Sequence, residues 1–152
     1  MANAAKKGPP ILEVTLEGAK RLVQMAFRAH ITPQLISSPG VGKSALFALI
    51  AEEWNLLLID IRLTEYDPTE MNGFPFILNP NDDPSKVKAG HVPLTTFPTE
   101  GDELPINPKT GKPYSGWLIL LDEFPSAPLS VQAAAYKVTL DRMVGNHKLH
   151  RK

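Results

Sequence analysis

The chain has 152 residues and no cysteine, and its sixteen basic side chains balance sixteen acidic ones. This length suits one modest domain, the lack of cysteine excludes disulfides and cysteine metal sites, and the balanced charge gives no indication of nucleic-acid binding. The longest apolar runs, such as residues 117–121, are too short to span a bilayer, and residues 1–10 lack the apolar core of a secretory signal. We therefore expect a cytoplasmic protein with no membrane partner.

The first part of the chain is expected to hold a leader, a helix and a strand. Residues 1–10 have the composition of a flexible leader. Thr15 is positioned to cap a helix, whose apolar face is formed by Ala19, Leu22, Val23, Ala26 and Phe27. After Pro33, residues 34–37 predict a short buried strand.

Residues 37–44 have the spacing of a phosphate-binding loop. The general pattern is G-x-x-x-x-G-K-[ST]; Gly42, Lys43 and Ser44 fill its last three places, while Ser37 replaces the first glycine. Gly40 and Gly42 allow backbone N–H groups to point at a polyphosphate. Lys43 can reach the outer phosphates, and the Ser44 hydroxyl can ligate magnesium. The alternative is a glycine turn before an ordinary helix with an incidental lysine.

The residues that follow support the loop and continue an α/β pattern. An apolar helical spacing after Ser44 gives the strand–loop–helix order that a phosphate-binding loop requires; its members are Ala45, Leu46, Leu49, Ile50 and Trp54. Residues 56–61 predict a strand buried on both faces. Asp67 and Glu70 flank Pro68 as a capping box does at the start of a helix.

Residues 73–116 differ in composition, because eight of the fifteen prolines fall there. A long irregular stretch inside a compact domain is typical of a functional insertion or a mobile loop, and a disordered surface excursion is the alternative. Residues 107–112 have the composition of a hairpin tip.

A second buried strand, residues 117–122, ends in two adjacent acids, Asp122 and Glu123. A carboxylate at the end of such a strand can lie beside magnesium, and Glu123 could orient or deprotonate an attacking water. Asp60 also follows four apolar residues, but no second carboxylate follows it, so Asp122 is the better candidate. A helix with Pro128 near its start is expected over residues 131–142.

Three blocks in this order, residues 38–44, 67–75 and 116–142, resemble AAA+ ATPases of the MoxR-like type. The resemblance covers about residues 15–150. It implies an ATP-binding Walker A loop and a Walker B pair, with Lys43 and Glu123 as catalytic residues and with Ser44 and Asp122 as magnesium ligands. The implied ATP-binding residues are Ser38, Pro39, Gly40, Val41, Gly42, Lys43, Ser44 and Asp122.

The resemblance also implies the fold, a P-loop NTPase with three α/β/α layers and a mainly parallel sheet in the strand order 5-1-4-3-2. Residues 34–37, 56–61 and 117–122 would be its first three strands. The fourth and fifth strands and the lid are absent, so residues 11–152 are expected to form a partial AAA+ domain with an insertion at about 71–116. We therefore expect a fragment of a longer ATPase that assembles as a homo-oligomeric ring.

The expected function is magnesium-dependent ATP hydrolysis that drives remodelling of a protein partner. Two alternatives remain open. One is a nucleotide-binding or interaction module without turnover. The other is a P-loop kinase for a small molecule, although the adjacent pair Asp122 and Glu123 favours water as the nucleophile.

Overall fold

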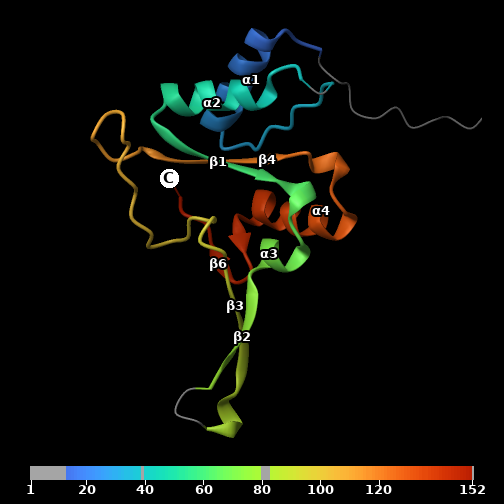
Figure 1. Cartoon of the computed structure of the whole chain (residues 1–152), viewed down its shortest axis with the longest axis vertical. Helices are drawn as coiled ribbons and strands as arrows, with labels where there is room; N and C mark the ends of the chain where they lie inside the picture. Colours follow the sequence, from blue (N-terminus) through green and yellow to red (C-terminus); the bar gives the residue numbers. More distant parts are fainter. Residues whose placement is uncertain (1–12, 39, 80–82, 152) are drawn as a thin grey trace, which may run out of the picture. The chain divides into compact units, whose positions relative to one another are not determined.

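The computed structural model describes residues 13–38, 40–79 and 83–151, and the chain divides into two compact units, residues 1–39 and 40–152. The expected leader and Pro39 lie outside the described residues. In the first unit, helix α1 spans Leu16–Arg28 (Figure 1). The predicted cap is confirmed, because the Thr15 hydroxyl accepts a hydrogen bond from the Gly18 N–H at 3.2 Å. The buried face of α1 includes Ala19 and Val23.

The prediction of a strand at residues 34–37 is wrong, since residues 31–38 have no regular secondary structure. A strand is held by hydrogen bonds to a neighbouring strand. In the strand order 5-1-4-3-2 of the AAA+ fold, the first strand lies between that fold's fourth and fifth strands. Neither of these two strands has a counterpart among the described elements. The apolar run alone therefore does not make a strand, and Ile36 is 72% exposed.

The second unit is built on two parallel strands with helices on both faces. Strand β1 spans Leu56–Arg62 and strand β4 spans Gly116–Asp122, and their register pairs Leu56 with Gly116 and Arg62 with Asp122. Helix α2, Lys43–Glu53, covers one face, and helix α4, Leu129–Tyr136, lies on the other (Figure 1). The two predicted strands and their adjacency are thus confirmed, in a mixed α/β arrangement.

Side chains alternate between the two faces of this parallel pair, as they must in any strand. Ile61 and Ile119 belong to a buried cluster with Val131 of α4, so their neighbours Arg62 and Leu118 project toward the opposite face, which α2 covers. The cluster also contains Leu63, Met71, Phe97, Ala127, Ala134, Ala135, Val138 and Val144. A buried core therefore lies between the sheet and α4.

Helix α3, Pro68–Asn72, begins with the predicted capping box. The Asp67 carboxylate accepts hydrogen bonds from the Thr69 and Glu70 N–H groups, and the Glu70 carboxylate accepts one from the Asp67 N–H. These backbone hydrogen bonds hold the pKa of Asp67 below its ordinary value, because they favour the charged carboxylate.

The proline-rich residues 73–116, expected to be an irregular insertion, contain an antiparallel ribbon of two strands. Strands β2, Phe74–Leu78, and β3, Lys88–Val92, form this ribbon, which projects from the sheet and helices of the second unit (Figure 1). Gly90 pairs with Phe76, and an added Cβ at Gly90 would lie 2.7 Å from the Phe76 ring. The glycine therefore leaves room for the ring to cover the neighbouring strand. Farther along, Ile106 and Pro113 form an antiparallel bridge around the predicted hairpin tip at residues 107–112.

The chain after α4 continues through a π-helical turn, Lys137–Asp141, into a second short ribbon. Strands β5, Met143–Val144, and β6, His147–Lys148, form it. The His147 ring lies 2.8 Å from the backbone oxygen of His91 in β3, so the two ribbons contact each other. Within the described ranges, no helix combines the length and apolar character needed to cross a membrane.

Candidate functional site

The loop before α2 has the backbone geometry that its glycines predict. Gly40 has φ +77° and Gly42 has φ +93°, a left-handed conformation that strains residues with a side chain. Gly42 is also the N-cap of α2, and it carries no side chain that could cover the first turn. The N–H groups of that turn carry the positive end of the helix dipole, which favours an anion.

Ser44, in the first turn of α2, contacts Asp122 at the end of β4. The Ser44 hydroxyl donates a hydrogen bond to Oδ2 of Asp122 at 3.0 Å, although the two residues are 78 positions apart in the chain. The other carboxylate oxygen, Oδ1, accepts the Glu123 N–H at 2.8 Å. Both oxygens of the half-buried Asp122 are therefore held, and the carboxylate is fixed at the start of α2.

Glu123 lies directly beyond this contact in an uncommon backbone conformation. Its φ is +57°, in the left-handed region, which costs free energy in a residue with a side chain and is often found at functional sites. Its side chain accepts a hydrogen bond from the Thr64 hydroxyl, whose oxygen lies 2.5 Å from Oε2. Two interactions thus place Glu123: the backbone hydrogen bond to Asp122 and the side-chain hydrogen bond to Thr64.

Thr64 is a site residue that sequence reasoning missed. It lies in the single 3₁₀ turn, Leu63–Glu65, that follows β1. The signal was present in the strand order, because the carboxyl ends of adjacent parallel strands meet at one edge of a sheet. A polar residue two positions beyond β1 therefore falls beside the acids that end β4.

Asp60, the competing acid, does not join this contact. Its register partner on β4 is Leu120, two residues before Asp122, and Ser44 donates to Asp122 instead. Of the two acids, Asp122 is the one that contacts the first turn of α2.

The remaining predicted residues are placed as follows. Lys43 is the first residue of α2 and is half-buried, while Val41 is 51% exposed. Ser38 is exposed in the first unit, and Pro39 is outside the described residues. The second unit thus brings together Ser44, Asp122, Glu123 and the unpredicted Thr64.

The oxygen atoms at this site suit magnesium better than a transition metal. The Ser44 hydroxyl and the Asp122 carboxylate are hard ligands, and magnesium commonly takes one or two protein oxygens together with waters and substrate phosphates. In the part of the chain that is described, no group of three or more His, Cys, Asp or Glu side chains could hold a metal ion. The other ligands of a cation at Ser44 and Asp122 would be waters or the oxygen atoms of a bound anion.

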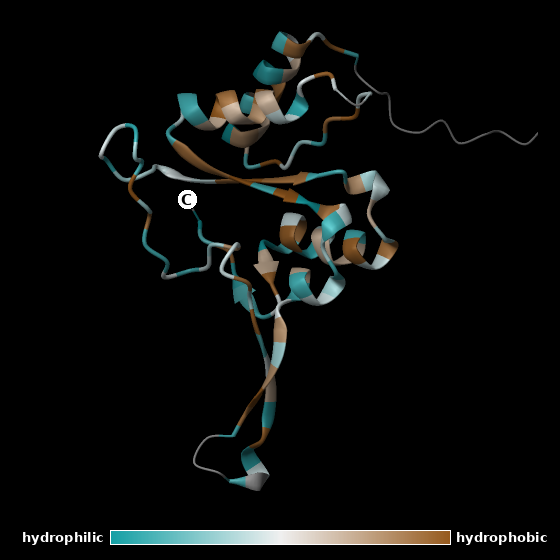
Figure 2. Ribbon diagram, in the orientation of Figure 1, coloured by the Kyte–Doolittle hydropathy of each residue, from teal (hydrophilic) through white to brown (hydrophobic). Residues whose placement is uncertain are grey.

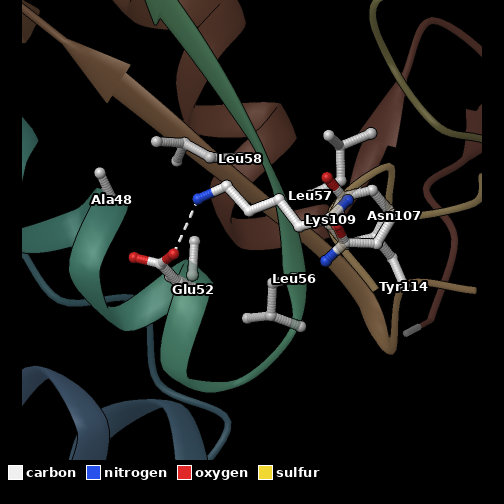
Figure 3. A pocket seen from close by; sticks show the side chains of 9 residues that line it. Ala48, Glu52, Leu56, Leu57, Leu58, Asn107, Lys109 and Tyr114 are labelled. Carbon is white, nitrogen blue, oxygen red and sulfur yellow. Dashed lines mark hydrogen bonds and ion pairs between the residues drawn. The ribbon is translucent and has the colours of Figure 1, made fainter. Parts of the chain in front are cut away.

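A separate pocket of about 240 Å³ lies at the other end of β1 (Figure 3). It is lined by Ala48, Ala51, Glu52, Leu56, Leu57, Leu58, Asn107, Lys109 and Tyr114. Leu56 begins β1, whereas Asp122 ends the parallel strand β4 beside it. This pocket and the Ser44–Asp122 contact therefore lie at opposite ends of the two strands. The pocket contains none of the predicted site residues.

Residues that line this pocket make two polar contacts. The Lys109 ammonium donates to the Glu52 carboxylate at 2.7 Å (Figure 3), and the Asn107 amide donates to Oδ1 of Asn55 at 2.8 Å. The hydrogen bond from Lys109, and then its positive charge, hold the pKa of Glu52 below its ordinary value. The same hydrogen bond, and then the negative charge of Glu52, hold the pKa of Lys109 above its ordinary value. The loop around residue 109 is thereby attached to the C-terminal end of α2.

No protein-family model, curated protein or solved structure matches this chain. The functional argument therefore depends on the chain's own geometry. That geometry joins a glycine-rich helix start, a hydroxyl, a fixed carboxylate and a second, oriented carboxylate, which together could bind a magnesium-bound polyphosphate and position a water beside it.

Proposed function

We propose that this protein binds ATP with magnesium at the start of α2 and hydrolyses it, as a MoxR-like AAA+ ATPase core. The single observation that supports this most strongly is the 3.0 Å hydrogen bond between Ser44 and Asp122. This hydrogen bond joins Asp122, the acid at the end of the apolar strand β4, to the hydroxyl of Ser44 in the phosphate-loop motif. Either motif alone could be incidental, but their contact across 78 residues supports a common role for the two side chains in binding a magnesium nucleotide.

Each residue has a role in this proposal. The loop N–H groups and the Lys43 ammonium would bind the phosphates and stabilise charge on the phosphoryl group. Ser44 and Asp122 would hold magnesium, which neutralises phosphate charge when bound. Glu123 would orient the attacking water and accept its proton. We place the remodelled protein partner at the β2–β3 ribbon, where Ile77 is 75% exposed and brown hydrophobic segments recur along the ribbon (Figure 2).

The binding test compares wild type with Lys43→Ala by thermal unfolding, with and without ATP and magnesium. A ligand at a hundred times its dissociation constant adds about 2.7 kcal/mol of stability, so the melting temperature of wild type should rise. Lys43→Ala should show little rise, because its phosphate contact is lost. Lys112→Ala is the matched control: Lys112 is exposed in the hairpin loop and outside the site, so it should respond as wild type does. An equal rise in all three proteins would contradict the role of Lys43.

The turnover test uses Glu123→Gln and phosphate release without an added acceptor. We expect Glu123→Gln to bind ATP normally and to lose turnover, because the amide cannot accept the proton. Binding without phosphate release in wild type would favour the interaction module. Phosphate transfer that requires a small-molecule acceptor would favour the kinase.

A further inference from the structure

We propose that Arg62 contacts the terminal phosphate of the bound nucleotide and makes the site prefer a triphosphate over a diphosphate. This inference rests on the proposed ATP-binding function and adds a residue that neither the phosphate-loop pattern nor the acidic pair contains. Arg62 is the last residue of β1, and its register partner on β4 is Asp122 itself.

The strand alternation places Arg62 and Asp122 on the same face of the sheet. Ile61 and Leu121, one position earlier on each strand, pack into the core on the α4 side. Arg62 and Asp122 therefore project toward the face that α2 covers, and Asp122 confirms this by its hydrogen bond with Ser44. Neighbouring strands lie about 4.8 Å apart, which is less than the length of an extended arginine side chain.

The present contacts of Arg62 leave its guanidinium available. Its ion pair is with Glu65 in the next turn, with 3.7 Å between the nearest nitrogen and oxygen, and the two side chains are 59% and 67% exposed. An exposed ion pair of this length contributes little free energy. Exchanging Glu65 for a phosphate oxygen would therefore cost little, and a guanidinium binds phosphate through two parallel hydrogen bonds.

The charges around Asp122 give a reason for a cation here. Asp60, Asp122, Glu123 and Glu65 all lie at or near the carboxyl ends of β1 and β4, and four carboxylates would repel the terminal phosphate of a nucleotide. Lys43 is at the start of α2, on the phosphate-loop side of the site. Arg62 would supply positive charge from the β1 side, beside its register partner Asp122.

The experiment measures ATP and ADP affinity by calorimetry with magnesium present, using Glu123→Gln as the parent so that ATP is not consumed. Removing a charged hydrogen bond costs at least about tenfold in affinity. We therefore expect Arg62→Ala to weaken ATP at least about tenfold and to leave ADP nearly unchanged. Arg62→Lys should recover part of the ATP affinity, because it keeps the charge but not the paired hydrogen bonds.

Arg21→Ala is the matched control, since Arg21 is also an exposed arginine paired with a glutamate, and it belongs to the first unit. It should leave both affinities unchanged. An equal loss of ATP and ADP affinity in Arg62→Ala, or no loss of either, would overturn the inference while leaving the proposed function intact. If the parent bound neither nucleotide, the proposed function would fail and the inference with it. Unfolding curves of Arg62→Ala and its parent should coincide, which separates a binding effect from misfolding.

Discussion

The Thr64 hydroxyl donates a hydrogen bond to the Glu123 carboxylate across the ends of β1 and β4. This hydrogen bond holds the Glu123 side chain in one orientation. Thr64→Val is nearly isosteric and removes the donor. We expect it to lower the rate of ATP hydrolysis roughly tenfold, the usual effect of losing a hydrogen bond to a charged group, with little change in ATP affinity. Steady-state turnover and calorimetry would separate these two quantities.

Thr64→Ser is the control for this prediction, because it keeps the hydroxyl and removes a methyl group. It should retain most of the turnover. An unchanged or faster rate in Thr64→Val would show that the hydrogen bond does not position Glu123 for catalysis.

The contact between Ser44 and Asp122 predicts how ATP binding depends on magnesium. In Ser44→Ala, one of the two proposed protein ligands is lost, so the gain in ATP affinity on adding magnesium should largely disappear. Affinity in the presence of a chelator should change little, because the loop N–H groups and Lys43 still bind the phosphates. Ser44→Thr keeps the hydroxyl and should keep the magnesium effect. A full magnesium effect in Ser44→Ala would remove Ser44 from the list of ligands.

Features set by local sequence were predicted well. The capping box at Asp67 and Glu70 depends on side chains three positions apart, and it forms as expected. The strands at residues 56–61 and 117–122 are apolar apart from Asp60 and Asp122, and α2 begins directly after the glycine loop. Ser44 and Asp122 were expected to bind the same magnesium ion, and their side chains are in contact.

Features set by partners distant in sequence were predicted poorly. Residues 34–36 have a strand composition, but composition does not supply a neighbour, and no strand forms there. The β2–β3 ribbon was not predicted, because proline is uncommon inside a strand and Pro75 lies within β2. The contact between Phe76 and Gly90 also joins residues on different strands. Phe97 is 2% exposed, so the irregular stretch after β3 contributes to the core. Its sequence, rich in proline, resembles that of a surface loop.

Gly73 controls the exit from α3 into the β2–β3 ribbon. Its φ is +88°, and an added Cβ would lie 2.7 Å from the backbone oxygen of Val92. Gly73→Ala should therefore destabilise the protein through both backbone strain and a clash with main-chain atoms that cannot move aside. Gly101 has φ +105° with nothing within 4 Å of an added Cβ, so Gly101→Ala adds the strain alone. In thermal unfolding, wild type should have the highest melting temperature, Gly101→Ala a lower one and Gly73→Ala the lowest. Equal values for the two variants would mean that Val92 does not restrict Gly73.

The ion pair between Glu52 and Lys109 predicts a pH dependence of stability. The pKa of Glu52 is lowered from its ordinary value of 4.5 by the hydrogen bond and the charge of Lys109. A carboxylate with a lowered pKa in the folded state stabilises the protein above its unfolded pKa, and this stabilisation is lost as pH falls through the folded pKa. The difference in melting temperature between wild type and Glu52→Gln should therefore be present at pH 6 and shrink as the pH falls below about 4.5. Both side chains are exposed, so the difference in melting temperature should be small and should weaken with added salt.

Glu103→Gln is the control, because Glu103 is exposed and lies in the same irregular stretch as Lys109. It should show no comparable pH-dependent difference. A difference for Glu52→Gln that stayed constant down to pH 3 would show that its effect does not come from the ion pair.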